Sequence, residues 1–229
     1  MLSQATVAPR VRLPNGCPAQ LRAPTADPFA GCAGLPGVDF SYHHDEEIYG
    51  EGEPAEFVYK VIIGAVRTYK LLSDGRRQIG AFHFAGELFG FGSGEEHRLT
   101  AEAVSDTTVR VYRRRSVEAQ AARDADLACR LWTLAAQELV RAEQLLLLLG
   151  RKTAIERVAT FLLEMETRTA AGGSIELPMP RRDIADYLGL TIETVSRTLT
   201  QLQAGGALQI SGARRVVLRN RAMLRRMED

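Results

Sequence analysis

The chain has 229 residues, of which 45% are hydrophobic and 25% charged, and its formal net charge is only +1. This composition is typical of a globular protein that buries a sizeable core, and the length suggests two domains. The apolar run at residues 145–149 is too short to cross a membrane, and the N-terminus lacks the charged-then-apolar order of a secretion signal. Three scattered cysteines do not make a secreted disulfide framework. We therefore expect a cytoplasmic protein that has no membrane partner.

The first 38 residues differ from the rest, because repeated prolines interrupt any helix and little apolar periodicity is present. We predict a partly ordered arm over residues 1–38. Residues 39–118 instead contain short β-like runs at 57–63, 66–72, 78–84 and 108–112. Ser73-Asp74-Gly75 between two of these runs is a strong hairpin signal. Many short strands with regular turns favour an antiparallel barrel or jelly roll over a parallel sheet.

One long helix with few breakers is predicted over residues 119–150. Side chains at a heptad-like spacing form a seam for a partner helix, which predicts a homodimer. The seam residues are Leu131, Ala135, Glu138, Ala142, Leu145 and Leu149. The alternative, packing only against the helix's own domain, is assigned to Leu127 and Trp132 and to parts of the leucine run. Gly150 is the expected hinge, followed by a C-terminal domain of residues 151–229 that opens with a helix at 153–166.

Residues 181–203 have the pattern of two amphipathic helices joined by a turn. The inward positions of the first helix, residues 181–188, are Ile184, Ala185 and Leu188, and those of the second are Val195, Leu199 and Leu202. Gly189 can take the left-handed conformation that ends a helix, and Thr191 is a good N-cap for the next one. This pattern predicts a helix-turn-helix, a unit that reads duplex DNA.

The outward face of the second helix is predicted to reach base edges. The predicted base-contacting residues are Ile192, Glu193, Ser196 and Arg197. Arginine matches guanine O6 and N7, glutamate accepts from a cytosine amino group, and an apolar side chain fits a thymine methyl. We expect Glu193 and Arg197, as i, i+4 neighbours, to form an ion pair that steadies the guanidinium, although such a pair is also common on ordinary helix surfaces. The predicted backbone contacts near the helix are Arg182, Thr191 and Thr194.

Two short apolar runs after the second helix, residues 208–210 and 216–218, predict a hairpin across residues 211–213. Such a hairpin is the wing of a winged helix, and Arg214 and Arg215 at or beside its tip are expected to neutralise phosphates. Residues 181–229 hold nine arginines, no lysine and five acids, so positive charge is concentrated here. Local basicity of this kind is typical of a DNA footprint, and double-stranded DNA is the predicted partner.

The string ETVSR at residues 193–197 resembles the Glu-x-x-Ser-Arg recognition motif of regulators related to the cyclic AMP receptor protein and the fumarate and nitrate reduction regulator (CRP/FNR). The wider run DIADYLGLTIETVSRTL resembles the FixK-type branch of this family. The resemblance as a whole extends over about residues 39–221. The resemblance implies an α+β fold: an N-terminal cyclic-nucleotide-binding-like antiparallel β-roll, a long dimerisation helix and a C-terminal winged helix-turn-helix.

The same resemblance implies a homodimeric transcription regulator, usually an activator, that binds a TTG-N8-CAA-type palindrome and works with RNA polymerase. It also implies control of microoxic respiration, denitrification or nitrogen-fixation genes. The exposed turn at residues 73–77 is either a polymerase contact or a simple solvated turn. No phosphate loop, nucleophile elbow or zinc-binding helix motif is present, which argues against an enzyme.

Nucleotide-binding members of this family hold a cyclic nucleotide and oxygen-sensing members hold an iron–sulfur cluster, and the sequence argues against both. Residues 86–88, Gly-Glu-Leu, resemble the start of the nucleotide cassette, but His97 and Arg98 stand where nucleotide binders have Arg and Ser. A shift of one residue along a strand turns Arg98 to the opposite face. Three cysteines are too few for a cluster with four ligands. We expect no cofactor and no metal; the alternative is a member gated by a small-molecule or redox ligand in the β-roll.

Overall fold

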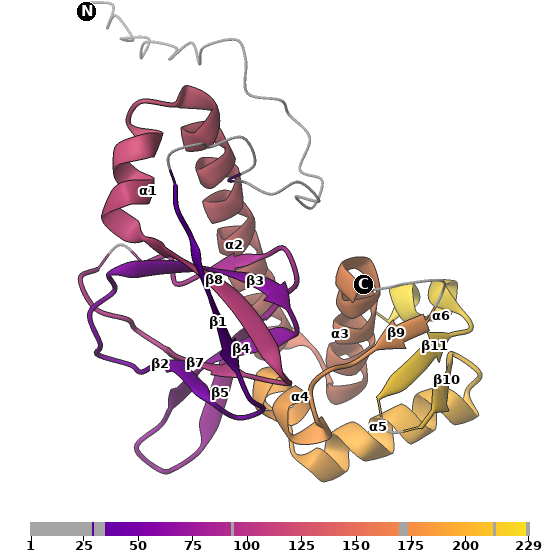
Figure 1. The fold of residues 1–229 in the computed structure, drawn as a ribbon. Helices are drawn as coiled ribbons and strands as arrows, with labels where there is room; N and C mark the ends of the chain where they lie inside the picture. The colour runs from indigo at the N-terminus through magenta and orange to yellow at the C-terminus, as the bar shows by residue number, and fades with distance from the viewer. Residues whose placement is uncertain (1–28, 30–34, 93, 170–173, 213, 228–229) are drawn as a thin grey trace, which may run out of the picture.

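The computed structural model describes residues 29, 35–92, 94–169, 174–212 and 214–227. It arranges them as a β-roll, a pair of helices and a C-terminal domain of helices and short strands (Figure 1). The α+β fold class expected from the sequence is confirmed. The predicted arm over residues 1–38 lies almost entirely outside the described residues. Within the described parts of the chain, no helix is long and apolar enough to span a bilayer.

The β-roll consists of two four-stranded antiparallel sheets. The first has the order β1-β8-β3-β6, with strands Val38–Tyr42, Thr107–Arg113, Phe57–Ile63 and Leu88–Phe89. The second has the order β2-β7-β4-β5, with strands Glu47–Tyr49, Thr100–Ala103, Ala65–Leu71 and Arg77–Phe84. The four runs predicted from the sequence correspond to β3, β4, β5 and β8. The other four were missed because strands of two to five residues carry too little alternation.

Side chains from both sheets fill the space between them. The buried cluster consists of Tyr49, Tyr59, Val61, Val66, Phe89, Ala101 and Val109. The tight turn from β3 to β4 depends on Gly64, whose φ of +90° is costly for residues with a Cβ and whose Cβ would collide with Thr107. Burying a Val or Phe side chain contributes roughly 1.5–3 kcal/mol, so this cluster contributes substantially to the stability of the β-roll.

Two helices, α1 (Arg114–Ala121) and α2 (Ala125–Arg151), replace the single helix predicted over residues 119–150. The break falls at Asp124, whose backbone is extended (φ −124°, ψ 99°) and whose carboxylate accepts a hydrogen bond from the Leu127 N–H at 3.0 Å. The short side chain of aspartate competes for backbone N–H groups, so aspartate starts a helix more readily than it continues one. The prediction of one unbroken helix was therefore wrong at its N-terminal end, where α1 packs back on α2.

The C-terminal domain begins with α3 (Ala154–Thr169), close to the predicted start. Gly150 lies in the last turn of α2, so the chain changes direction at Lys152 (ψ 144°) and not at the predicted glycine hinge. The remaining elements are β9 (Ser174–Glu176), α4 (Arg181–Leu188), α5 (Ile192–Ala204), β10 (Leu208–Ser211), β11 (Arg215–Leu218) and α6 (Arg221–Arg226). The strands form a sheet of order β10-β11-β9, in which β10 and β11 are the predicted hairpin and β9 was not predicted.

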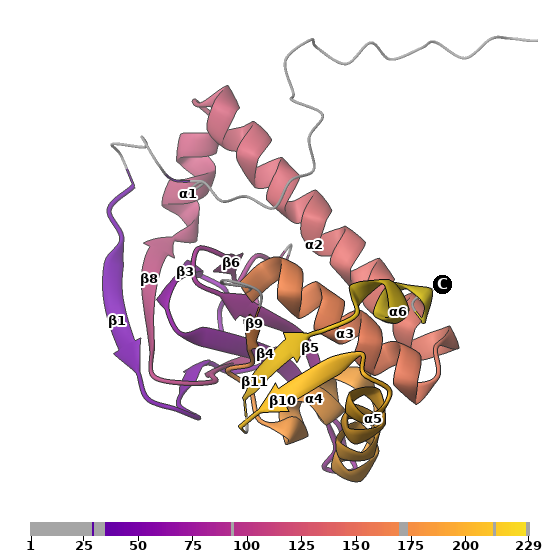
Figure 2. The ribbon, with the colours of Figure 1, turned by 90° about the vertical axis from the view of Figure 1, so that its right-hand side faces the viewer.

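The two domains share one hydrophobic cluster. Phe82 of β5 packs on Tyr187 of α4 with ring centroids 5.4 Å apart, and Tyr187 packs on Phe161 of α3 at 5.8 Å. α4 accordingly lies between the β-roll and α5 in both views, while α2 runs along the molecule from α1 to the C-terminal domain (Figures 1 and 2). The position of the helix-turn-helix is therefore tied to the β-roll.

Candidate nucleic-acid interface

The helix-turn-helix has the geometry that the sequence predicts. α4 spans residues 181–188, and Gly189 follows it in the left-handed conformation (φ 60°, ψ 41°), with its N–H bonded to the Ala185 carbonyl. A Cβ at Gly189 would also press on Leu149 at 3.3 Å. Thr191 then caps α5 by accepting a hydrogen bond from the Thr194 N–H at 3.2 Å. Local backbone chemistry thus fixes the angle between the two helices.

The two faces of the helix-turn-helix separate as expected. The inward positions of both helices are buried: Ile184, Ala185, Leu188, Val195, Leu199 and Leu202. The predicted base-contacting side chains Ile192, Glu193, Ser196 and Arg197 are exposed. Ile192 is 42% exposed, which leaves its side chain accessible to another apolar group. The outer face of α5 therefore carries an apolar, an acidic, a hydroxyl and a cationic group.

The expected ion pair between Glu193 and Arg197 is not formed, and that prediction was wrong. The backbone N–H of Glu193 and the Thr191 hydroxyl donate hydrogen bonds to the Glu193 carboxylate and hold its pKa below the ordinary value. Glu193 lies in the first turn of α5, where unpaired N–H groups compete successfully for a carboxylate. Among the residues that the structure describes, Arg197 has no hydrogen bond or ion pair, so its guanidinium is available for a partner outside the chain.

The predicted phosphate contacts surround this face. Arg182, Thr191, Arg214 and Arg215 are exposed, and Thr194 is half-buried. The Thr191 and Thr194 hydroxyls lie 3.1 Å apart at the start of α5. Arg215 also donates to the Ser174 hydroxyl of β9 at 3.3 Å, so the third strand, which sequence reasoning missed, helps to place this arginine. All nine residues of the predicted DNA surface come from α4, α5 and the β10–β11 wing.

The row of apolar side chains that α2 exposes to solvent is not the predicted seam but the row one position further along the sequence. Leu131, Leu145 and Leu149 pack against the protein's own hydrophobic clusters, and Glu138 pairs with Arg141 of the same helix at 2.6 Å. Of the predicted seam, only Ala135 and Ala142 lie exposed. The large exposed side chains are Trp132 (73%), Leu139 (61%), Val140, Leu146 (72%) and Leu147.

Leu127 and Trp132 were both predicted to pack only against their own domain. Leu127 is completely buried, which agrees with the prediction, whereas Trp132 is 73% exposed and the prediction was wrong for it. The heptad spacing defines an interval along the helix but not which row faces the β-roll, since apolar residues occur on more than one face of this helix. Only the fold decides that Trp132, Leu139 and Leu146, at intervals of seven residues, make one solvent-facing stripe.

Glu87, the expected acid of a nucleotide cassette, is engaged by the protein itself. Its carboxylate accepts hydrogen bonds from Arg168 of α3 at 2.7 Å and from Arg141 of α2 at 3.2 Å. Burial by itself raises the pKa of Glu87, but the charge and hydrogen bond of Arg168 and the charge of Arg141 hold it below the ordinary value. The carboxylate links three parts of the chain and is not free for a ribose hydroxyl.

The residues that replace the Arg–Ser pair of nucleotide binders lie in the loop before β7 and not in the predicted strand. Arg98 is exposed, as expected, whereas His97 is buried and stacks on Tyr49 with ring centroids 3.6 Å apart. Tyr59 and Phe89 continue the stack, 5.1 Å apart. Among the described residues, this aromatic stack offers no charge to a cyclic phosphate.

His83, also inside the β-roll, predicts a pH dependence of stability. Burial, more than any neighbouring charge, lowers its pKa from 6.5 to about 4. Between pH 6.5 and 4 the unfolded chain binds a proton that the folded chain does not, so stability falls with falling pH, by on the order of 3 kcal/mol from this group. We expect His83→Gln to flatten the urea-unfolding free energy over this pH range, with the exposed His43→Gln as control. An unchanged slope in His83→Gln would show that other groups cause it.

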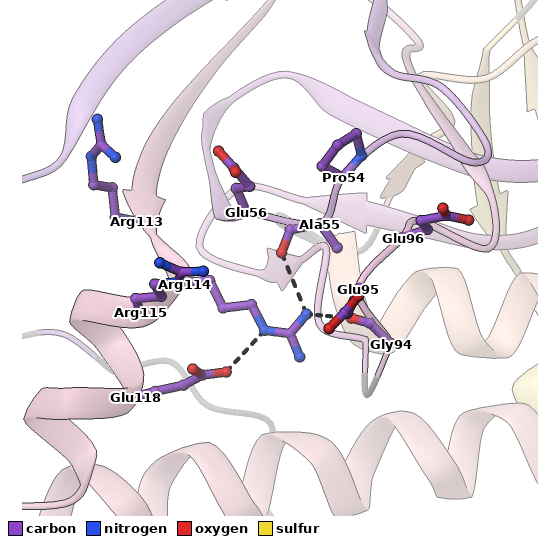
Figure 3. A pocket seen from close by; sticks show the side chains of 10 residues that line it. All are labelled: Pro54, Ala55, Glu56, Gly94, Glu95, Glu96, Arg113, Arg114, Arg115 and Glu118. Atoms are coloured by element: carbon purple, nitrogen blue, oxygen red, sulfur yellow. Dashed lines mark hydrogen bonds and ion pairs between the residues drawn. The ribbon is translucent and has the colours of Figure 1, made fainter.

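A pocket between the β-roll and α1 is lined by charged residues of both signs (Figure 3). Its central cation, Arg114, is fully engaged: it donates to the carbonyls of Ala55 and Gly94 and pairs with Glu118 at 2.9 Å. This arginine therefore braces α1 against the loop before β7. The described groups in this pocket favour a structural role over ligand binding.

Comparison with known families agrees with this architecture. Residues 39–124 match the model of the cyclic nucleotide-binding domain, and residues 156–227 match that of the Crp-like helix-turn-helix domain. A β-roll joined by a long helix to a winged helix-turn-helix with an exposed α5 defines a DNA-binding transcription regulator of the CRP type.

Individual relatives narrow this class. The chain is 48% identical to the nitrogen fixation regulation protein FixK of Azorhizobium caulinodans, covering 86% of this chain and 80% of that protein. It is 43% identical to FixK of Rhizobium meliloti, covering 79% and 82%. The solved structure of FixK2 from Bradyrhizobium japonicum is 61% identical with a TM-score of 0.83, covering 85% of this chain and 98% of that one. The chain belongs to the FixK-type regulators of the CRP/FNR superfamily.

Proposed function

We propose that the protein acts as a homodimer that binds a TTG-N8-CAA-type operator and activates genes of microoxic respiration, denitrification or nitrogen fixation. The observation that carries this proposal is the exposed face of α5, where Ile192, Glu193, Ser196 and Arg197 all point to solvent. The relatives named for nitrogen fixation regulation support the physiological part. RNA polymerase is the second partner that an activator requires.

The chemistry of α5 suits a TTG half-site. The exposed guanidinium of Arg197 matches guanine O6 and N7, and the Glu193 carboxylate can accept from the amino group of a cytosine. Ile192 can meet a thymine methyl, while Ser196 can bond a base or a phosphate. Arg182, Thr191, Thr194, Arg214 and Arg215 would hold the flanking phosphates.

A dimer brings two such faces to one operator. Half-sites of three base pairs separated by eight have centres about 11 base pairs apart, close to one turn of B-DNA, about 34–36 Å. The stripe of Trp132, Leu139 and Leu146 on α2 is the surface we assign to the dimer contact, in place of the seam predicted from the sequence alone. Ala135 and Ala142 lie exposed on the same helix and allow close approach of a partner helix.

The interior of the β-roll supports activity without a bound effector, because Glu87 is neutralised by Arg141 and Arg168. Cys129 is half-buried in α2, and the other two cysteines lie outside the described residues. We propose that neither a cyclic nucleotide nor an iron–sulfur cluster is needed for DNA binding. Activity would then follow the amount of protein present.

Selection of bound duplexes from a randomised pool tests this function. The full chain should recover TTG and CAA in two-fold arrangement, with half-site centres about 11 base pairs apart. Adding cyclic AMP or cyclic GMP should change neither the recovered sequence nor the yield. Recovery of single, asymmetric sites would contradict the dimeric reading, and a sequence recovered only with a nucleotide would contradict effector independence.

A further inference from the structure

Four charged residues join the β-roll to the first helix of the helix-turn-helix. Arg67 of β4 donates to Asp183 of α4, with Nη1 and Oδ2 2.8 Å apart. Arg77 of β5 hydrogen-bonds Asp183 and also Asp186, the latter at 2.9 Å. The side chains of Arg67 and Asp183 are only 5% and 2% exposed. We call these four residues the α4 clamp.

The β-roll side of the clamp is itself fixed. Arg67 lies opposite Glu102 in the β4–β7 ladder, bonds to its carboxylate, and donates to Asp45 at 2.6 Å. Burial by itself lowers the pKa of Arg67, but the hydrogen bond to Glu102, the charge of Asp183 and the hydrogen bond to Asp45 raise it above the ordinary value. The guanidinium therefore stays charged and in place, and α4 is the element that docks against it.

The clamp holds α4 at two points. Asp183 and Asp186 are i, i+3 neighbours on one side of α4, and their partners come from adjacent strands. Two attachments fix the rotation of a helix about its own axis as well as its distance from the sheet. Because α4 also packs on α5, the direction of α5 relative to the β-roll follows.

The clamp leaves the DNA-facing side open. The predicted base-contacting side chains of α5 remain exposed while Asp183 is buried against the β-roll. A contact that covered α5 would keep the protein off DNA, whereas this one holds α4 and leaves α5 accessible. Arg168 of α3, bonded to Glu87, provides a separate connection between the domains, so loosening the clamp should not detach them.

We propose that Asp183 and Asp186 are positioning residues, which orient the two recognition helices of a dimer for half-sites one helical turn apart. This inference rests on the proposed function. The β-roll, whose own interior is filled by aromatic side chains, then serves as a frame for DNA reading. Arg67 and Arg77, more than a hundred positions before α5 in the sequence, would thereby help to determine which half-site spacing the dimer binds.

The test removes Arg77, which is on the β-roll and is not among the predicted DNA contacts. We expect Arg77→Ala to weaken operator binding by about tenfold, within the 5- to 150-fold range typical of coupling between sites. Its preference for the natural spacing over an operator with one added base pair should also fall, while its preference for TTG over a substituted half-site stays. Arg76→Ala is the matched control, because the side chain of Arg76 pairs, within the part of the chain that the structure describes, only with Asp74 of the same hairpin.

Asp186→Asn removes one charge of the clamp from the α4 side, leaves Asp183 in place, and decides the matter if Arg77→Ala fails to fold. It should lose part of the affinity and of the spacing preference, whereas Arg77→Lys, which keeps a cation beside the two aspartates, should retain more of both than Arg77→Ala. A folded Arg77→Ala protein with wild-type affinity and spacing preference, or a folded Asp186→Asn protein with both unchanged, overturns the inference alone. A wild-type protein without a two-fold operator overturns the proposed function as well, and this is seen before any variant is compared.

Discussion

Replacing Arg197 with alanine is expected to weaken operator binding by about 2–6 kcal/mol per dimer, roughly 30-fold or more, since a bidentate arginine–guanine contact is worth 1–3 kcal/mol and each operator has two. Arg197 is exposed and, within the described chain, has no partner, so the folded protein should lose little else. The same variant should lose its preference for G·C at one position of each half-site. Titration of operators that carry each base pair at that position measures both effects.

Arg214→Ala is the matched control, because it also removes one exposed arginine from the DNA-facing domain, but from the turn of the wing and not from α5. A phosphate contact carries no sequence information, so this variant should weaken all duplexes similarly. It should lower the slope of log affinity against log salt by about two for a dimer. If Arg197→Ala keeps the wild-type base preference, or shows only the salt effect, Arg197 is a phosphate contact and the assignment is wrong.

The helix-turn-helix was predictable because its signals are local. Gly189 and Thr191 determine the turn through backbone conformation and capping, which depend on a few neighbouring residues. Burial at Val195 and Leu199 follows from helical spacing alone. The exposed face of α5 could therefore be named from the sequence, although the local competition for the Glu193 carboxylate was missed.

The α4 clamp could not be predicted in the same way. Arg67 and Asp183 are separated by 116 positions, and each is an ordinary charged residue in its own stretch of sequence. Their pairing depends on how the β-roll and the C-terminal domain pack, which no local pattern specifies. The sequence motif DIADYLGL contains both clamp aspartates, but it identifies a family and does not reveal their partners.

The row of α2 that faces solvent depends on the same packing. Leu131 and Trp132 are neighbours in the sequence, yet one contacts the protein's own cluster and the other is 73% exposed. A helix that covers a domain on one side and meets a partner on the other has two apolar rows, and spacing alone does not distinguish them. A substitution in the exposed row therefore tests which of the two rows of α2 meets a partner helix.

Leu139→Glu is expected to abolish the proposed dimer at micromolar concentration, because it would place two carboxylates in the apolar contact that we assign to this stripe, where each costs several kcal/mol. In a monomer Leu139 is 61% exposed, so the fold should tolerate the change and thermal unfolding should be little altered. Operator binding should fall by about a hundredfold or more, since a monomer engages one half-site. Sedimentation over a dilution series, with and without operator, measures both.

Gln144→Glu is the control for the added charge, because it lies on the same helix, exposed, but roughly 140° around it from Leu139. It should leave dimer and operator affinity unchanged. Leu145→Glu separates the two rows of α2: its side chain packs on the shared hydrophobic cluster, so the variant should lose folding stability before it loses dimerisation. A folded, monomeric Leu145→Glu beside a dimeric Leu139→Glu would instead support the seam predicted from the heptad pattern.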